Sequence, residues 1–117
     1  MAPTWIAEER VTFVHPDGRR EAGRIAVGLP ELDDDGVARC PVVAEGCYPR
    51  LHPMAGDGTL QALLLGVRLL GTLLHVFKER GGRVLAADED EELPLDAFFG
   101  PLLRMPEVPA AEDEGER

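Results

Sequence analysis

One apolar segment limits what this chain can fold into more than any other feature. Residues 58–82, GTLQALLLGVRLLGTLLHVFKERGG, hold more apolar side chains than one face of a surface helix requires. Asp57 or Thr59 can cap the start of a helix here, and Gln61 can reach back as in a capping box. Gly81 and Gly82 end it. The sequence therefore predicts a helix of about 22 residues, roughly 33 Å long.

A polar stripe on this helix argues against a membrane span. The apolar stretch over residues 60–77 is 18 residues long, just within the range that crosses a bilayer. Arg68 stands at its centre, where a charge costs about 2.5 to 3.5 kcal/mol in a bilayer. Polar side chains recur along one line of the helix, at Gln61, Arg68, Thr72, His75 and Glu79. We therefore expect a soluble helix whose opposite face fills a core.

The apolar surface of this helix is wider than one face. The predicted core face consists of Leu60, Leu63, Leu64, Val67, Leu70, Leu74 and Phe77. Four more apolar side chains lie outside that face, at Ala62, Leu69, Leu73 and Val76. The C-terminal segment AFFGPLL can cover this flank within one monomer. If it does not, Leu69, Leu73 and Val76 are expected to form the interface of a homodimer.

Alternating residues ahead of the helix predict a β-hairpin. Apolar residues occur at every second position around Val11 and around Ile25, which is the period of half-buried strands. Between them, HPDG at residues 15–18 has the composition of a tight turn. A third strand is predicted over residues 37–44, at a sheet edge or with a bulge, because Pro41 cannot donate a ladder hydrogen bond.

The remaining segments complete a single α+β domain. Residues 30–36 and 45–58 are expected to be loops, residues 83–86 a short fourth strand, and residues 94–103 a short helix. The fold predicted for residues 1–103 is a small antiparallel β-meander packed against one long helix, with a short C-terminal helix. From residue 104 to 117 the content of Pro, Ala and Glu predicts a disordered acidic tail.

The charge is unevenly distributed. Of the net charge of −10, residues 86–117 carry −9 and residues 1–85 carry −1. Such a chain repels phosphate backbones, so we expect no nucleic-acid partner. The N-terminal residues lack the basic start and apolar run of a signal peptide, which predicts a cytoplasmic protein with reduced cysteines.

No set of residues predicts catalysis. Cys40, Cys47 and His52 are of the types that bind zinc, but their spacing is not typical of a zinc site and a fourth ligand is not evident. The chain contains no serine and no nucleophile motif. The acidic runs lack the spaced ligands of a calcium loop. We therefore expect neither cofactor nor enzymatic activity, and the alternative is a small-ligand or metal-binding enzyme that uses Cys40, Cys47 and His52.

Several quoted segments together resemble a known family. The order WIAEERVTFVHPDGRREAGRIAVGLP, a CP strand, GTLQALLLGVRLLGTLLHVFKERGG and PLDAFFGPLL resembles a family of short bacterial proteins classed as a domain of unknown function. The resemblance covers most of residues 4–103 and implies a self-contained domain without assigned catalytic residues. A strand meander followed by a helix that begins GTLQAL is also similar to immunity proteins of bacterial toxin systems.

These features together predict a protein that acts by binding another protein. An acidic surface suits an immunity or similar neutralising protein, because it can steer and bind a basic partner such as a toxin. We expect five acidic residues to contact that partner: Asp88, Glu89, Asp90, Glu91 and Glu92.

Overall fold

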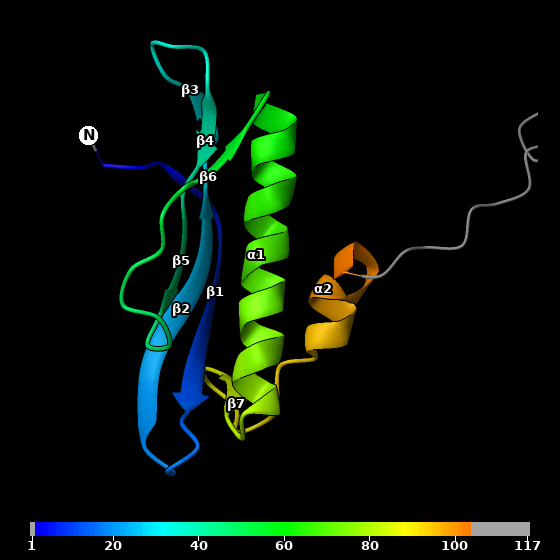
Figure 1. Ribbon diagram of the computed structural model, residues 1–117. Coiled ribbons are helices and arrows are strands. Elements are labelled where there is room, and N and C mark those ends of the chain that lie inside the picture. Colours follow the sequence, from blue (N-terminus) through cyan, green and yellow to red (C-terminus); the bar gives the residue numbers. More distant parts are fainter. Residues whose placement is uncertain (1, 104–117) are drawn as a thin grey trace, which may run out of the picture.

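The observed helices and strands confirm the α+β fold. The computed structural model describes residues 2–103, in which an antiparallel four-stranded sheet and a three-stranded sheet pack against helix α1 (Figure 1). The elements in chain order are β1 (Trp5–Val14), β2 (Arg20–Gly28), β3 (Glu31–Leu32), β4 (Ala38–Cys40), β5 (Val42–Glu45), β6 (Met54–Gly56), α1 (Thr59–Glu79), β7 (Arg83–Ala86) and α2 (Leu95–Leu103). The tail predicted over residues 104–117 lies outside the described residues.

Strands β1 and β2 form the predicted hairpin at the centre of the larger sheet, whose strand order is β5-β2-β1-β7. The predicted turn joins them. The N–H of His15 donates to the carbonyl of Arg19, and the carbonyl of His15 accepts from the N–H of Gly18, both at 2.8 Å. Gly18 has a φ of +91°, a conformation that side chains with a Cβ rarely adopt.

The predicted third strand is broken at Pro41 and contributes to two sheets. Before the proline, β4 lies between β3 and β6 in the smaller sheet. After it, β5 pairs with β2 at one edge of the larger sheet. Pro41 still accepts a hydrogen bond of 2.8 Å from the N–H of Gly28 but has no N–H to donate. The irregularity expected at this residue is therefore a change of sheet.

Two short strands, β3 and β6, contradict the prediction that residues 30–36 and 45–58 are loops. Each pairs with β4, one on either side. The turn between β3 and β4 is closed by Asp33, whose N–H donates to the carbonyl of Val37 at 2.9 Å. Strands of two and three residues are too short to show alternation, so the sequence carries no period from which to predict them.

The start of α1 falls within the predicted interval, but the capping residue differs. Neither Asp57 nor Thr59 is the N-cap; that position is occupied by Gly58, and no side chain of residues 2–103 caps it by a hydrogen bond. Gln61 does reach back as predicted, because its Oε1 accepts a hydrogen bond of 2.6 Å from the N–H of Asp57. One half of the predicted capping box is therefore present.

The end of α1 confirms the predicted glycine stop. The N–H of Gly81 donates to the carbonyl of Lys78, and the N–H of Gly82 donates to that of Phe77, both at 3.0 Å. With a φ of +100° at Gly81, these two bonds form a Schellman motif, which reverses the chain into β7. Strand β7 spans the residues predicted for it.

The buried face of α1 is rotated from the predicted face. Its buried residues are Ala62, Gly66, Leu70, Gly71, Leu74 and Phe77. Leu60 and Leu64, which were predicted to be core, are 68% and 48% exposed. The cause is close approach at Gly66, where an added Cβ would lie 3.0 Å from Val42 Cγ1 and 3.2 Å from Cys40 Sγ. The helix therefore rests on the broken strand through its small residues, and its leucine flank turns outward.

Helix α2 packs on one flank of α1, as Figure 1 shows. The contact is close because Gly71 has no side chain; a Cβ there would lie 2.8 Å from Phe99 Cβ. His75 Nε2 lies 3.2 Å from Asp96 Oδ1 and adds a polar contact between the helices. The predicted C-terminal helix thus covers the core, on the flank of Gly71.

Helix α1 is long and apolar enough, by length and composition alone, to cross a membrane. In this fold it carries the predicted polar stripe, since Gln61, Arg68, Thr72 and Glu79 are exposed and His75 is half-buried. Its opposite face packs on both sheets.

Candidate functional site

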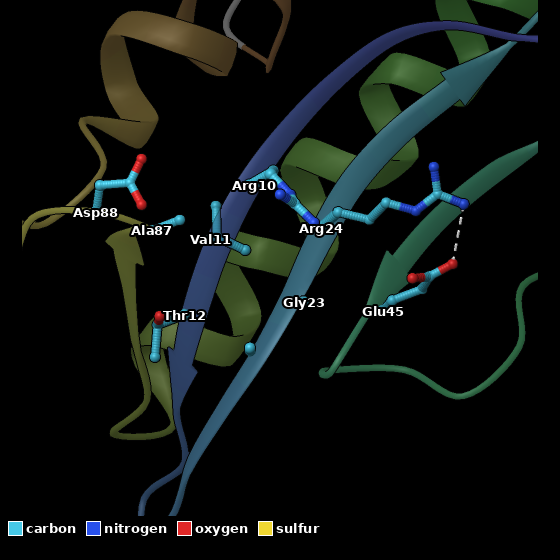
Figure 2. Close-up of a pocket in the computed structure, with 9 residues that line it drawn as sticks. Arg10, Val11, Thr12, Gly23, Arg24, Glu45, Ala87 and Asp88 are labelled. Atoms are coloured by element: carbon cyan, nitrogen blue, oxygen red, sulfur yellow. Dashed lines mark hydrogen bonds and ion pairs between the residues drawn. The ribbon is translucent and has the colours of Figure 1, made fainter.

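Strand β1 is longer than the strand that pairs with its outer edge. It pairs with β2 from Trp5 to Val14, apart from a bulge at Ile6, whereas β7 pairs only with residues 11–14. Figure 2 shows the chain turning away from β1 at Ala87 and Asp88. Among residues 2–103, no strand pairs with the outer edge of β1 over residues 5–10. We call this the open edge.

The far edge of β7 is covered by the chain itself. The N–H of Ala86 donates to the carbonyl of Glu91, and the N–H of Leu93 donates to that of Val84, both at 2.8 Å. Neighbouring residues of a strand direct their backbone groups to opposite edges. The N–H and C=O of Leu85 therefore point toward β1.

Two residues direct their backbone groups outward from the open edge. Leu85 lies opposite Thr12 of β1, so the backbone groups of Thr12 point toward β7. By the same alternation, the N–H and C=O of Arg10 and Glu8 point to the same side, beyond the end of β7. Unpaired strand edges of this kind are templates for another strand.

A groove lies between the open edge and the turn after β7. It has a volume of about 410 Å³ and is lined by Glu8, Glu9, Arg10, Ala86, Ala87, Asp88 and Glu89. We call it the acidic groove, because its lining contains four carboxylates and one guanidinium. Asp88 and Glu89 were predicted from the sequence as partner-binding residues, whereas Glu8, Glu9 and Arg10 were not. These residues are distant in sequence, and only the pairing of β1 with β7 brings them to the acidic run.

A second hollow adjoins the acidic groove on the sheet face opposite α1 (Figure 2). Its volume is about 380 Å³, and its lining includes Arg10, Thr12, Arg24, Glu45 and Asp88. Arg10, Ala87 and Asp88 line both hollows. The surface is thus indented on both sides of Arg10.

The two arginines of this hollow have different surroundings. Arg24 Nη1 lies 3.1 Å from Glu8 Oε1, and Arg24 Nη2 lies 3.0 Å from Glu45 Oε2. The hydrogen bond to Glu45, supported by Glu8, raises the pKa of Arg24, and its guanidinium carbon lies 5.0 Å from the centre of a Trp5 ring. In the described part of the chain Arg10 makes no ion pair. Arg24 thus joins three strands of the sheet, while Arg10 is available to a ligand.

Two of the five carboxylates in the predicted acidic run, residues 88–92, form ion pairs within residues 2–103. Asp90 Oδ1 lies 2.7 Å from Arg20 Nη2. Glu92 lies 3.6 Å from Lys78 Nζ and 3.3 Å from Arg83 Nε. Within residues 2–103 the other three carboxylates make no ion pair: Asp88, Glu89 and Glu91. Of these, Asp88 and Glu89 line the acidic groove.

The residues predicted for a dimer interface lie on the flank of α1 opposite α2. Leu69, Leu73 and Val76 are half-buried. The carbonyl of Leu73 accepts a hydrogen bond of 3.5 Å from the Tyr48 hydroxyl, so this flank faces the segment after β5. The exposed large apolar side chains of the two helices lie elsewhere, at Leu60, Leu64 and Phe98. The AFFGPLL segment therefore does not cover the flank that it was expected to cover.

The structure does not bring Cys40, Cys47 and His52 together as a metal site. Cys40 is fully buried, with Sγ 3.5 Å from the Gly28 carbonyl, and burial raises the pKa of its thiol. His52 is exposed. Across residues 2–103, no three His, Cys, Asp or Glu side chains are grouped so as to hold a metal ion.

Cys47 instead lines a small hollow that the sequence did not indicate. The hollow has a volume of about 190 Å³ and is also lined by His15, Glu21 and Gly46. His15 Nε2 lies 3.1 Å from Glu21 Oε1 and 3.1 Å from the Gly46 carbonyl. Burial, and to a lesser degree Glu21, raises the pKa of Cys47 to about 12. This thiol is therefore protonated at neutral pH and is not an activated nucleophile.

No family model, no curated protein and no solved structure shows significant similarity to this chain. The function is therefore inferred from the geometry and charge of the site.

Proposed function

We propose that this chain is a non-enzymatic protein that binds a basic protein partner through the acidic groove. The observation that carries the proposal is the meeting of Glu8 and Glu9 with Asp88 and Glu89 around one groove. Within the described residues, Asp88, Glu89 and Glu9 are exposed and not neutralised by ion pairs, and they outnumber the one unpaired guanidinium of the groove, Arg10, so the groove is net acidic. A net charge of −10 adds long-range attraction for a basic partner.

An immunity or neutralising role fits this proposal. Such a protein needs a complementary surface rather than catalytic groups, and a basic toxin in the cytoplasm is a suitable partner. The alternative, an enzyme that uses Cys40, Cys47 and His52, requires thiolates, whereas the pKa of each thiol is raised. Stoichiometric zinc in the purified protein would favour that alternative.

Site-specific photo-crosslinking tests the proposal. A photoreactive residue at position 89 is compared with one at position 34, since Glu89 and Asp34 are both exposed acidic residues and Asp34 lies in the distant β3–β4 turn. We expect position 89 to give an adduct with a basic protein and position 34 to give none. The purified partner is then tested for direct binding. No adduct at position 89, or equal adducts at both positions, contradicts the proposal.

Charge substitutions measure the contribution of the groove. We expect Asp88→Asn combined with Glu89→Gln to weaken binding about tenfold at low salt, because each removed carboxylate contributes roughly 0.5 to 1 kcal/mol at an exposed interface. The difference should shrink as salt screens the charges. Asp34→Asn is the control and should leave the affinity unchanged.

A further inference from the structure

We infer that the partner binds by adding a strand to the open edge: an extended basic segment lies beside β1, in the position beyond the end of β7. The inference rests on the proposed function and specifies how the partner is held. Strand addition of this kind is a known mode of peptide recognition, in which backbone hydrogen bonds give affinity and side chains give specificity.

The open edge has the length and the backbone groups that strand addition needs. Residues 5–10 extend about 20 Å at roughly 3.3 Å per residue, and beyond the bulge at Ile6 the regular part of the edge is residues 7–10, about 13 Å. The outward N–H and C=O of Glu8 and Arg10 recur at every second residue, as an antiparallel or parallel neighbour requires. Because β7 already occupies the same edge over residues 11–14, an added strand continues the existing sheet.

The side chains along the open edge select the occupant by charge. Glu8 and Glu9 are adjacent in β1, so their carboxylates point to opposite faces of the sheet, and that of Glu8 is already paired with Arg24. Asp88 and Glu89 add two more carboxylates where β7 ends. A strand with several Lys or Arg therefore gains opposite-charge pairs with Glu9, Asp88 and Glu89, which no ion pair neutralises within residues 2–103. A second copy of β1 is itself net acidic over residues 5–10, with two Glu and one Arg, and gains less. We therefore assign the edge to a basic segment of another protein.

The flank of α1 that carries Leu60 and Leu64 lies on the same side of the molecule as the open edge. Leu60, Leu64, Gly71 and Lys78 follow one line along the helix, and Lys78 Nζ reaches Glu92, which pairs beside β7. Gly71 is covered by α2, but Leu60 and Leu64 are exposed. Apolar side chains of the added segment, alternating with its basic ones, can contact this flank.

The test uses a fluorescent peptide about seven residues long that alternates Lys and Val, which is long enough to span the open edge. We expect it to bind the whole protein at low salt, and a Glu–Val peptide of equal length to show no binding. Two further Lys–Val peptides carry N-methyl groups on every second residue. In one peptide the methyl groups lie along one edge of the strand, and in the other they lie along the opposite edge. The peptide methylated on the edge that faces β1 should bind at least tenfold more weakly, and the other should bind as the parent does.

Amide hydrogen exchange locates the bound peptide. In the free protein we expect the amides of Glu8 and Arg10 to exchange fast and those of Glu9 and Val11, which pair with β2, to exchange slowly. The Lys–Val peptide should slow the exchange at Glu8 and Arg10 at least tenfold. On the protein side, Glu8→Pro removes one outward N–H and should weaken peptide binding more than Glu8→Gln, which removes the charge alone.

Any one of three results overturns the inference. The Lys–Val peptide does not bind, both methylated peptides lose affinity equally, or the peptide leaves amide exchange at Glu8 and Arg10 unchanged. Slow exchange at these amides in a free protein of doubled mass would assign the edge to a second copy instead. If the crosslink at position 89 finds a partner while the peptide tests fail, the proposed function stands and strand addition does not. If the peptide binds but position 89 captures no partner, the proposed function fails.

Discussion

At the residue scale, the chemistry of single side chains depends on neighbours that the sequence does not reveal. Cys47 was expected to be an ordinary reduced thiol, and its surroundings come from the β1–β2 hairpin, which brings His15 and Glu21 beside it. Glu8 and Glu9 look like ordinary strand residues until β7 places Asp88 and Glu89 nearby. The types of these residues can be read from the sequence, but only the pairing of the strands in the folded chain brings their side chains together.

The raised pKa of Cys47 predicts slow alkylation in the native state. With a folded pKa of about 12 against an ordinary value of 9.0, the native thiol should react with iodoacetamide far more slowly at pH 9 than the thiol of the urea-unfolded chain. Peptide mapping by mass spectrometry separates Cys47 from Cys40. Equal rates in the two states would contradict the burial of this thiol.

The same shift predicts how stability depends on pH. A thiol whose pKa is raised by folding contributes its full stability below the unfolded value near 9 and loses it as the pH rises toward 12. The free energy of unfolding, measured with urea, should therefore fall above pH 9 more steeply in the wild type than in Cys47→Ala. Parallel curves for the two proteins would show that Cys47 makes no such contribution.

At the element scale, long periodic segments were predictable and short ones were not. The hairpin and α1 carry a period or a stop signal, such as the two glycines after α1, and β7 was the one short strand predicted, directly after that stop. Strands β3 and β6 are too short to carry either. The rotation of α1 was not predictable, because it depends on the fit of Gly66 against Val42 and Cys40 rather than on the number of leucines.

Matched leucine substitutions test the observed rotation of α1. Leu74 is fully buried and Leu64 is 48% exposed, so Leu74→Ala leaves a cavity and Leu64→Ala does not. We expect Leu74→Ala to lower the free energy of unfolding by about 2 to 5 kcal/mol, and Leu64→Ala by about 1 kcal/mol or less. Urea denaturation measures both. Comparable losses of unfolding free energy at the two sites would instead support the core face predicted from the sequence, which includes both leucines.

At the scale of the whole molecule, length and composition anticipated one acidic domain, and topology decides where another molecule can bind. Neither the open edge nor the acidic groove can be predicted from composition, since both arise because β7 is shorter than β1. The flank of α1 that carries Leu69, Leu73 and Val76 is half-buried, and the homodimer through it stays a prediction.

Light scattering decides between monomer and dimer. A homodimer through this flank should have twice the chain mass of 12.7 kDa, and Leu73→Glu should return it to 12.7 kDa, because an unpaired charge in an apolar interface costs several kcal/mol. Leu64→Glu, on the other flank, is the control and should leave the mass unchanged. A wild-type mass near 12.7 kDa rejects the dimer, and a Leu73→Glu protein that unfolds shows that Leu73 belongs to the core.

The short β7 also has a consequence for the order in which the fold assembles. Strands β1 to β6 and their turns are close in sequence, whereas β7 is separated from β1 by the rest of these strands and by α1. Only four residue pairs then join β7 to β1. We expect β7 to be the last strand to join and the first to open, with amide exchange faster at Leu85 than at Ala26 in β2. Each such opening would lengthen the open edge toward Val14.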